Sequence, residues 1–194
     1  MRRPAPLAAR GLTLPAPVIT LPGYLGSPPH HWQSLWEAAD PRIVRFSPAS
    51  FDAPDLADWR AALGRAIAAA PAPPVLVAHS LACLLVPHLI DTAAPVAGAM
   101  LVAPPDPAGA AFPPDLAAFR AVPTGRLPFR TLVVASTDDP YGTADFAQRM
   151  AAGWGAGFVS VGAKGHINAE SGLGDWPHGR NLLTAFCAGA GIAA

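Results

Sequence analysis

The chain has 194 residues, of which 52% are hydrophobic and 13% are charged, and its thirteen basic residues balance thirteen acidic ones. This composition excludes a disordered polymer, which needs high charge and low hydrophobicity. It also gives no field that would attract nucleic acid or an anionic membrane. The length predicts a single domain, which we place at residues 16–194, after a flexible N-terminal tail at residues 1–15.

Apolar strand patterns alternate along the chain with segments of helical periodicity, as at Trp32, Leu35 and Trp36. In chain order we expect a strand at 17–21, a helix at 31–39, a strand at 42–46, a helix at 55–70 capped by Asp55, a strand at 74–78, a buried helix at 81–90, a strand at 97–103, an irregular proline-rich stretch at 104–128 with a short helix at 115–120, a strand at 131–135, a helix at 143–153, a strand at 157–161 and a helix at 177–188. This alternation predicts an α/β fold with a doubly wound, mostly parallel sheet of about six strands.

The N-terminus and the cysteines favour a cytoplasmic protein. Prolines and Arg10 interrupt the apolar run that an export signal needs, and no stretch reaches the ~18 apolar residues of a membrane span. Cys83 and Cys187 lie far apart without a redox or metal-binding spacing, and two free thiols fit a reducing compartment. No histidine pair has the spacing of a metal site, so we expect no metal.

Several predicted strands are continuous apolar runs, which is typical of strands covered by helices on both faces. Right-handed crossovers bring the carboxyl ends of such strands to one edge, where ligands bind. The third strand ends at Ala78-His79-Ser80-Leu81-Ala82. This is the small-x-Ser-x-small pattern of a nucleophile elbow, with Ala at both small positions instead of Gly. The same residue pattern would also occur if Ser80 only capped the helix that follows the strand.

The loops after later strands supply the partners that a nucleophilic serine needs. Ser80 requires a base to take its proton and a carboxylate to orient that base. Asp138 and Asp139 follow the fifth strand and His166 follows the sixth, which is the Ser, Asp, His order of α/β-hydrolases. The two aspartates compete for this role, and we favour Asp139, because Asp139-Pro140-Tyr141 resembles the start of the loop in which the hydrolase acid usually sits. Asp138 would then be a turn or cap residue.

Two backbone amides are needed to bind the oxyanion. We expect one from Leu81 and one from the loop after the first strand, most favourably from Tyr24, where Gly23 permits a close approach of the backbone. His30 or His31 could line the pocket, and His79 would pack or orient the elbow. No glycine-rich phosphate loop follows a strand, which argues against a nucleotide-binding protein.

Four segments together resemble a small family of serine hydrolases typified by retinoblastoma-binding protein nine and its bacterial relatives. They are Leu21-Pro-Gly-Tyr24 with His31-Trp32-Gln33, Ala78–Cys83, Ala135–Tyr141, and Gly165–Gly174 with Trp176-Pro177, and the resemblance covers about residues 17–188. It implies a compact α/β-hydrolase fold without a large lid domain, with Asp139 rather than Asp138 as the catalytic acid. Ala82 departs from the pattern, because Gly is commoner there in bacterial members.

The resemblance also implies hydrolysis of simple carboxylic esters without a cofactor. We expect Ser80, Asp139 and His166 to be catalytic, Gly23, Tyr24 and Leu81 to form the oxyanion and substrate site, and the partner to be a small ester. Asn168 and Glu170 would hold the histidine loop in place. The alternative is a binding module with this fold, whose triad is residual and whose role is to bind a protein. The sequence does not give the oligomeric state.

Overall fold

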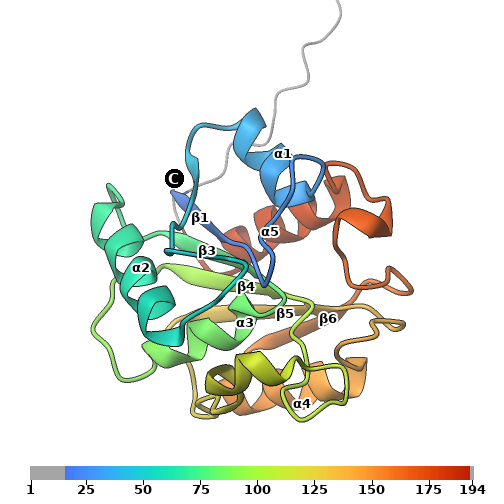
Figure 1. The fold of residues 1–194 in the computed structure, drawn as a ribbon. Helices are drawn as coiled ribbons and strands as arrows, with labels where there is room; N and C mark the ends of the chain where they lie inside the picture. The colour runs from blue at the N-terminus through green and yellow to red at the C-terminus, as the bar shows by residue number, and fades with distance from the viewer. Residues whose placement is uncertain (1–15, 193–194) are drawn as a thin grey trace, which may run out of the picture.

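A computed structural model describes residues 16–192, so the tail expected at residues 1–15 lies outside the described residues. One parallel sheet of six strands, in the order β2-β1-β3-β4-β5-β6, runs through the described part of the chain (Figure 1). The strands are β1 (Val18–Leu21), β2 (Ile43–Arg45), β3 (Val75–His79), β4 (Gly98–Val102), β5 (Arg130–Ala135) and β6 (Gly157–Ser160). The predicted fold class is confirmed.

Helices cover both faces of this sheet. The α-helices are α1 (Trp32–Ala39), α2 (Leu56–Ala69), α3 (Ala82–Leu85), α4 (Ala144–Trp154) and α5 (Pro177–Gly189), and the 3₁₀ helices are η1 (Val86–Leu89), η2 (Pro114–Arg120) and η3 (Ala169–Ser171). In Figure 1, α1 and α5 lie on one side of the sheet, and α2, α3 and α4 lie on the other. No large lid covers the sheet edge within residues 16–192.

Alternate residues of each central strand enter two separate hydrophobic clusters. Leu76 and Ala78 of β3 pack into the cluster that holds the residues of α2, α3 and α4, whereas Val75 and Val77 pack with Trp32 on the side of α1 and α5. Every residue of β3 is therefore buried. This explains why residues 75–78 of the strand form a continuous apolar run instead of alternating with polar residues.

The buried helix expected at residues 81–90 is present over residues 82–89, but it changes from α to 3₁₀ geometry part-way. An α-helix of one turn ends at Leu85, and a 3₁₀ turn continues to Leu89. Pro87 accounts for the change, because it has no N–H to donate and its ring would clash with the carbonyl four residues earlier. The other expected helices are present, with His31, Asp55 and Thr143 as side-chain caps of α1, α2 and α4.

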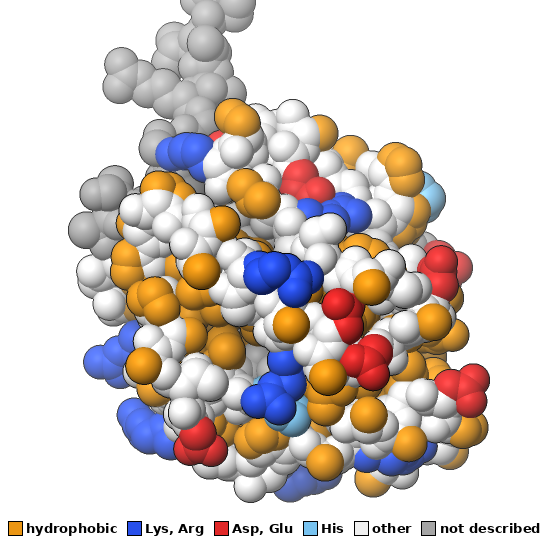
Figure 2. Space-filling model, turned by 60° about the vertical axis from the view of Figure 1, so that its left-hand side comes forward, with side chains coloured by type: hydrophobic (Ala, Val, Ile, Leu, Met, Phe, Trp, Pro, Cys, Tyr) orange, Lys and Arg blue, Asp and Glu red, His pale blue; other side chains and the backbone are white. Residues whose placement is uncertain are grey.

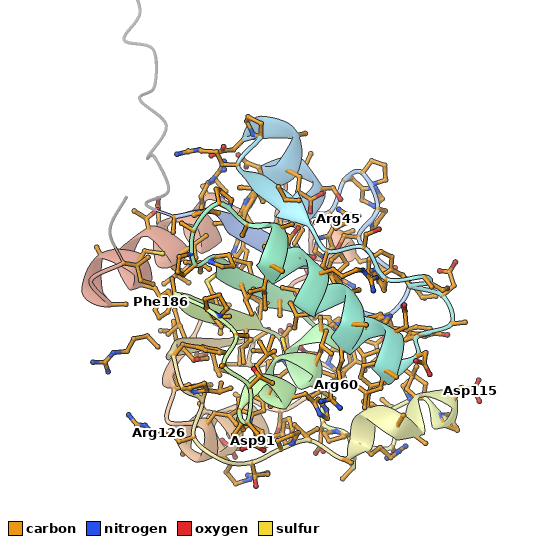
Figure 3. The ribbon with its side chains drawn as sticks, turned by 90° about the vertical axis from the view of Figure 1, so that its left-hand side faces the viewer. Arg45, Arg60, Asp91, Asp115, Arg126 and Phe186 are labelled. Carbon is orange, nitrogen blue, oxygen red and sulfur yellow. The ribbon has the colours of Figure 1, made fainter. Side chains whose placement is uncertain are left out.

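Among residues 16–192, the surface on the α2 side shows no patch of one charge (Figure 2). Figure 2 shows hydrophobic side chains interspersed with basic and acidic ones on this face. The same side is seen as sticks in Figure 3, where Arg45 at the end of β2 and Asp115 of η2 are labelled. A hollow of about 690 Å³ lies here between the β1–β2 edge and α2, lined by Val44, Ala66 and other residues. No described helix is long and apolar enough to cross a membrane.

Candidate active site

Ser80 lies at a sharp turn directly after β3. Its φ is +54°, a left-handed conformation that L-residues adopt at an energetic cost of about 1–3 kcal/mol. Ala78 and Ala82 on either side are fully buried, which lets strand and helix approach each other. The backbone therefore has the geometry of a nucleophile elbow, with the side chain of Ser80 raised above the sheet edge.

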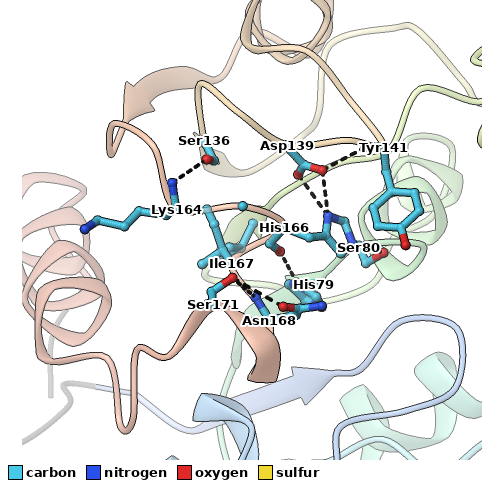
Figure 4. A network of polar contacts seen from close by, with 12 residues as sticks. His79, Ser80, Ser136, Asp139, Tyr141, Lys164, His166, Ile167, Asn168 and Ser171 are labelled. Atoms are coloured by element: carbon cyan, nitrogen blue, oxygen red, sulfur yellow. Dashed lines mark hydrogen bonds and ion pairs between the residues drawn. The ribbon is translucent and has the colours of Figure 1, made fainter.

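Ser80, His166 and Asp139 form a continuous chain of polar contacts (Figure 4). The Nε2 atom of His166 lies 2.8 Å from the Ser80 Oγ atom, and its Nδ1 atom lies 2.9 and 3.0 Å from the two carboxylate oxygens of Asp139. Asp139 also accepts a hydrogen bond from the Tyr141 amide at 2.9 Å. With the Nδ1 proton donated to the carboxylate, Nε2 is free to accept the serine proton.

Asp138 contacts the backbone of the histidine loop and does not contact the imidazole. One of its oxygens accepts the Ser136 hydroxyl at 2.6 Å and the Gly165 amide at 2.7 Å. The Ser136 hydroxyl oxygen accepts the Lys164 amide in turn at 2.8 Å. The Ser136 hydroxyl, followed by the amide of Gly165, holds the pKa of Asp138 below its usual value. The two aspartates therefore have different contacts: Asp139 contacts the His166 ring, whereas Asp138 and its partner Ser136 bind the Gly165 and Lys164 amides that precede this ring.

The far side of the histidine loop is held by ring N–H groups. Nε2 of His79 donates to the His166 carbonyl at 2.9 Å, and Nε1 of Trp32 donates to the Ile167 carbonyl at 2.8 Å. Burial, followed by the charge of His166, lowers the pKa of His79, so His79 is neutral at neutral pH. The sequence placed His79 at the elbow, but its partner lies 87 residues away and no local pattern reveals it.

The loop after β1 packs directly against the elbow. A Cβ atom on Gly23 would lie 2.8 Å from Ser80 Cβ and 3.1 Å from the Leu81 nitrogen, so only glycine fits without displacement. Among the described residues, no group accepts a hydrogen bond from the Tyr24 or Leu81 amide. Two unoccupied donors therefore lie on adjoining segments beside Ser80.

A cavity of about 510 Å³ opens beside Ser80, and both His30 and His31 line it. Nδ1 of His31 accepts the Gln33 amide at the start of α1, so Nε2 carries the proton. That Nε2 atom is buried and has no hydrogen-bond partner among the described residues. Burial is the main cause, and the positive charge of Arg45 the second, of a pKa of His31 lowered to about 3. This ring therefore stays uncharged at neutral pH.

Asn168 and Glu170 follow the histidine and differ in role. The Asn168 side chain accepts the Glu170 amide at 3.1 Å and the Ser171 hydroxyl at 3.3 Å, which closes the η3 turn that the sequence did not predict. Glu170 is one of the residues that line the cavity, and its carboxylate makes no hydrogen bond with a described residue. Asn168 thus holds the loop by its side chain, whereas Glu170 faces the place where substrate would bind.

The described residues contain no cluster of histidine, cysteine or carboxylate groups that could hold a metal ion. Cys83 and Cys187 are free and buried. Burial raises the pKa of Cys83 well above its ordinary value, so its thiol stays protonated and unreactive at neutral pH.

The sequence model of the serine hydrolase family matches residues 18–185. This chain belongs to that family. The hydrolase is similar in structure to a protein described as a YdeN-like hydrolase from Pectobacterium atrosepticum, with 32% identity and a TM-score of 0.79 over 89% of this chain and 91% of that one. No curated protein matches the chain.

Two further structures share the fold. The product of the ydeN gene from B. subtilis is 22% identical, with a TM-score of 0.71 over 88% of this hydrolase and 98% of that chain. An esterase domain from Rhodothermus marinus is 16% identical, with a TM-score of 0.62 over 94% of this hydrolase and 89% of that chain.

Proposed function

We propose that this serine hydrolase is a carboxylesterase-like enzyme that uses Ser80, His166 and Asp139 as a catalytic triad. The observation that carries the proposal is the contact chain of 2.8 Å and 2.9 Å from Ser80 through His166 to Asp139. These distances lie within the range at which a base takes a proton from a nucleophile. The rings of His79 and His31 have lowered pKa values and are uncharged at neutral pH. Neither ring therefore adds a positive charge beside the His166 imidazole.

In the first half of the reaction the Ser80 oxygen forms a bond to the ester carbonyl carbon, and its proton passes to Nε2 of His166. Asp139 holds the imidazole in orientation and stabilises its protonated form. The amides of Tyr24 and Leu81 donate to the oxyanion. The bond to the leaving oxygen then breaks as His166 returns the proton to it, and an acyl-serine remains.

In the second half a water molecule attacks the acyl carbon while His166 accepts one of its protons. The acid leaves when the proton returns to Ser80, so the enzyme ends as it began. Water is the only co-reactant, and neither half needs a cofactor. Oxyanion binding is typically worth a factor of about 10²–10³ in rate for each donor.

The test compares wild type with the Ser80→Ala variant on a short-chain nitrophenyl ester. We expect turnover to fall to background in the variant while its urea unfolding curve stays close to that of wild type. Turnover that survives the substitution would remove Ser80 from the mechanism. A folded wild type that neither hydrolyses the ester nor reacts with a fluorophosphonate would favour the alternative of a binding module with a residual triad.

A further inference from the structure

The cavity beside Ser80 has two chemically different walls. One wall comes from the proline-rich stretch after β4 and consists of Pro105, Ala111, Phe112, Pro113 and Leu116. Phe112 and Leu116 belong to the hydrophobic cluster on the α2 and α4 side of the sheet. This wall presents no charged group, so it suits a hydrocarbon chain.

A second part of the lining, which we call the polar wall, comes from the loops that precede α1 and surround η3. Its polar residues are His30, His31, Asn168 and Glu170, and the same loops also contribute Tyr24, Leu25, Pro28 and Ala169. The two loops that supply it are tied together by the hydrogen bond from Trp32 to the Ile167 carbonyl, and both of those residues belong to the cluster on the α1 and α5 side.

This polar wall offers both donors and acceptors. The Asn168 oxygen is used within the η3 turn, so its N–H₂ group has no hydrogen-bond partner among residues 16–192. The Glu170 carboxylate is equally unengaged with the described chain. An amide donor and a carboxylate acceptor on residues of the same cavity lining suit a hydroxyl group, because a hydroxyl both donates and accepts.

The position of the general acid decides which part of the substrate meets which wall. The leaving oxygen must come within hydrogen-bond distance of Nε2 of His166 to receive its proton. His166 lies in the same loop as Asn168 and Glu170, so the leaving alcohol extends along the polar wall. The acyl chain then lies on the other side of Ser80, against Phe112 and Leu116.

We propose that the enzyme is selective for esters that join an apolar acyl chain to a hydroxyl-bearing alcohol such as a polyol. The acyl chain binds against the stretch that follows β4, and the free hydroxyls bind Asn168 and Glu170. This inference rests on the proposed esterase function and adds the substrate class and its orientation.

The first experiment compares 1-monobutyrin with 2-methylbutyl butyrate, in which methyl groups replace both hydroxyls. Each rate is divided by the hydroxide-catalysed rate of the same ester, which removes the difference in leaving-group reactivity. We expect kcat/KM to favour monobutyrin by about tenfold, since each of the two hydrogen bonds is worth about threefold. The Glu170→Ala variant should lose about threefold of this preference, whereas Asp175→Ala, an exposed acidic residue of the same loop outside the cavity, should keep it.

The second experiment reduces the space in the cavity along the apolar wall. Ala111 is exposed and lines the cavity, while its exposed neighbour Ala110 does not. Ala111→Trp should lower kcat/KM for a glycerol monooctanoate at least tenfold more than for a glycerol monoacetate. Ala110→Trp is the matched control and should lower neither.

The outcomes separate this inference from the proposed function. The proposed orientation would be overturned, with the esterase function intact, by equal normalised rates on the two butyrates or by a preference for the alkyl ester. A loss of kcat/KM in Ala111→Trp that does not depend on acyl length would overturn it in the same way. A wild type that hydrolyses none of these esters would overturn both.

Discussion

Gly23 is the position where one added methyl group tests the oxyanion site. In the Gly23→Ala variant the new Cβ would lie 2.8 Å from Ser80 Cβ, 2.9 Å from the His79 oxygen and 3.1 Å from the Leu81 nitrogen. Carbon atoms stop repelling each other at about 3.5 Å, so the loop after β1 must retreat by roughly 0.7 Å. Two of the three obstructing atoms belong to the backbone, which cannot rotate away as a side chain can.

This retreat carries the Tyr24 amide away from the oxyanion position, where donors must lie at about 2.7–3.1 Å. We therefore expect kcat on nitrophenyl butyrate to fall about 10²–10³-fold, with a smaller change in KM. Overpacking should also lower the free energy of unfolding by about 1–3 kcal/mol. Urea unfolding of the same samples shows whether the lost activity occurs in folded protein.

Gly64 provides the matched control for this substitution. A Cβ atom there meets nothing within 4 Å, and the residue lies inside α2. Gly64→Ala should therefore keep full activity and gain about 1 kcal/mol of stability, because alanine favours a helix. A folded Gly23→Ala variant with kcat within twofold of wild type would refute the placement of the oxyanion site.

Asp139→Asn should reduce kcat by roughly 10³–10⁴-fold because the imidazole loses its orienting carboxylate, and a loss below tenfold would contradict the assignment of the acid. Asp138→Ala should reduce kcat about tenfold by freeing the Gly165 peptide, and Asp138→Asn should restore it because an amide oxygen still accepts that hydrogen bond; equal losses in both would refute this role. The low folded pKa of His31 means that the unfolded chain binds more protons below pH 6.5, so stability should fall by about 1.4 kcal/mol per pH unit from pH 6 to pH 4 from this residue. Urea titrations at each pH should show a shallower fall of the free energy of unfolding in His31→Asn, which keeps the helix cap. The control His178→Asn, which replaces an exposed histidine, should show the same fall as wild type.

The order of strands and helices could be predicted from the sequence because it depends on local patterns. A short window of residues is enough to predict the apolar strand before Ser80 and the apolar face of α2. The break at Pro87 was missed, because the apolar residues on both sides of it continue the helical pattern. The turn at Ala169–Ser171 was missed as well, since it depends on the side chain of Asn168 closing a loop of three residues.

The site was predicted in its residue types but not in its supporting contacts. Ser80 and His166 could be placed because each follows a strand, and parallel strands end at one edge. The sequence favoured Asp139 over Asp138 only through the Pro140-Tyr141 that follows it, since neighbouring aspartates otherwise differ only in where each side chain points. The contact from His79 to the His166 carbonyl joins segments far apart in sequence, so only the folded structure reveals it.

The most direct test of the central claim is to react the folded protein with a fluorophosphonate and to measure its intact mass and the modified peptide. The account predicts a single adduct on Ser80, and no adduct in a Ser80→Ala variant that unfolds at the same urea concentration as wild type. An adduct on another residue, or a folded wild type that stays unmodified, would contradict it.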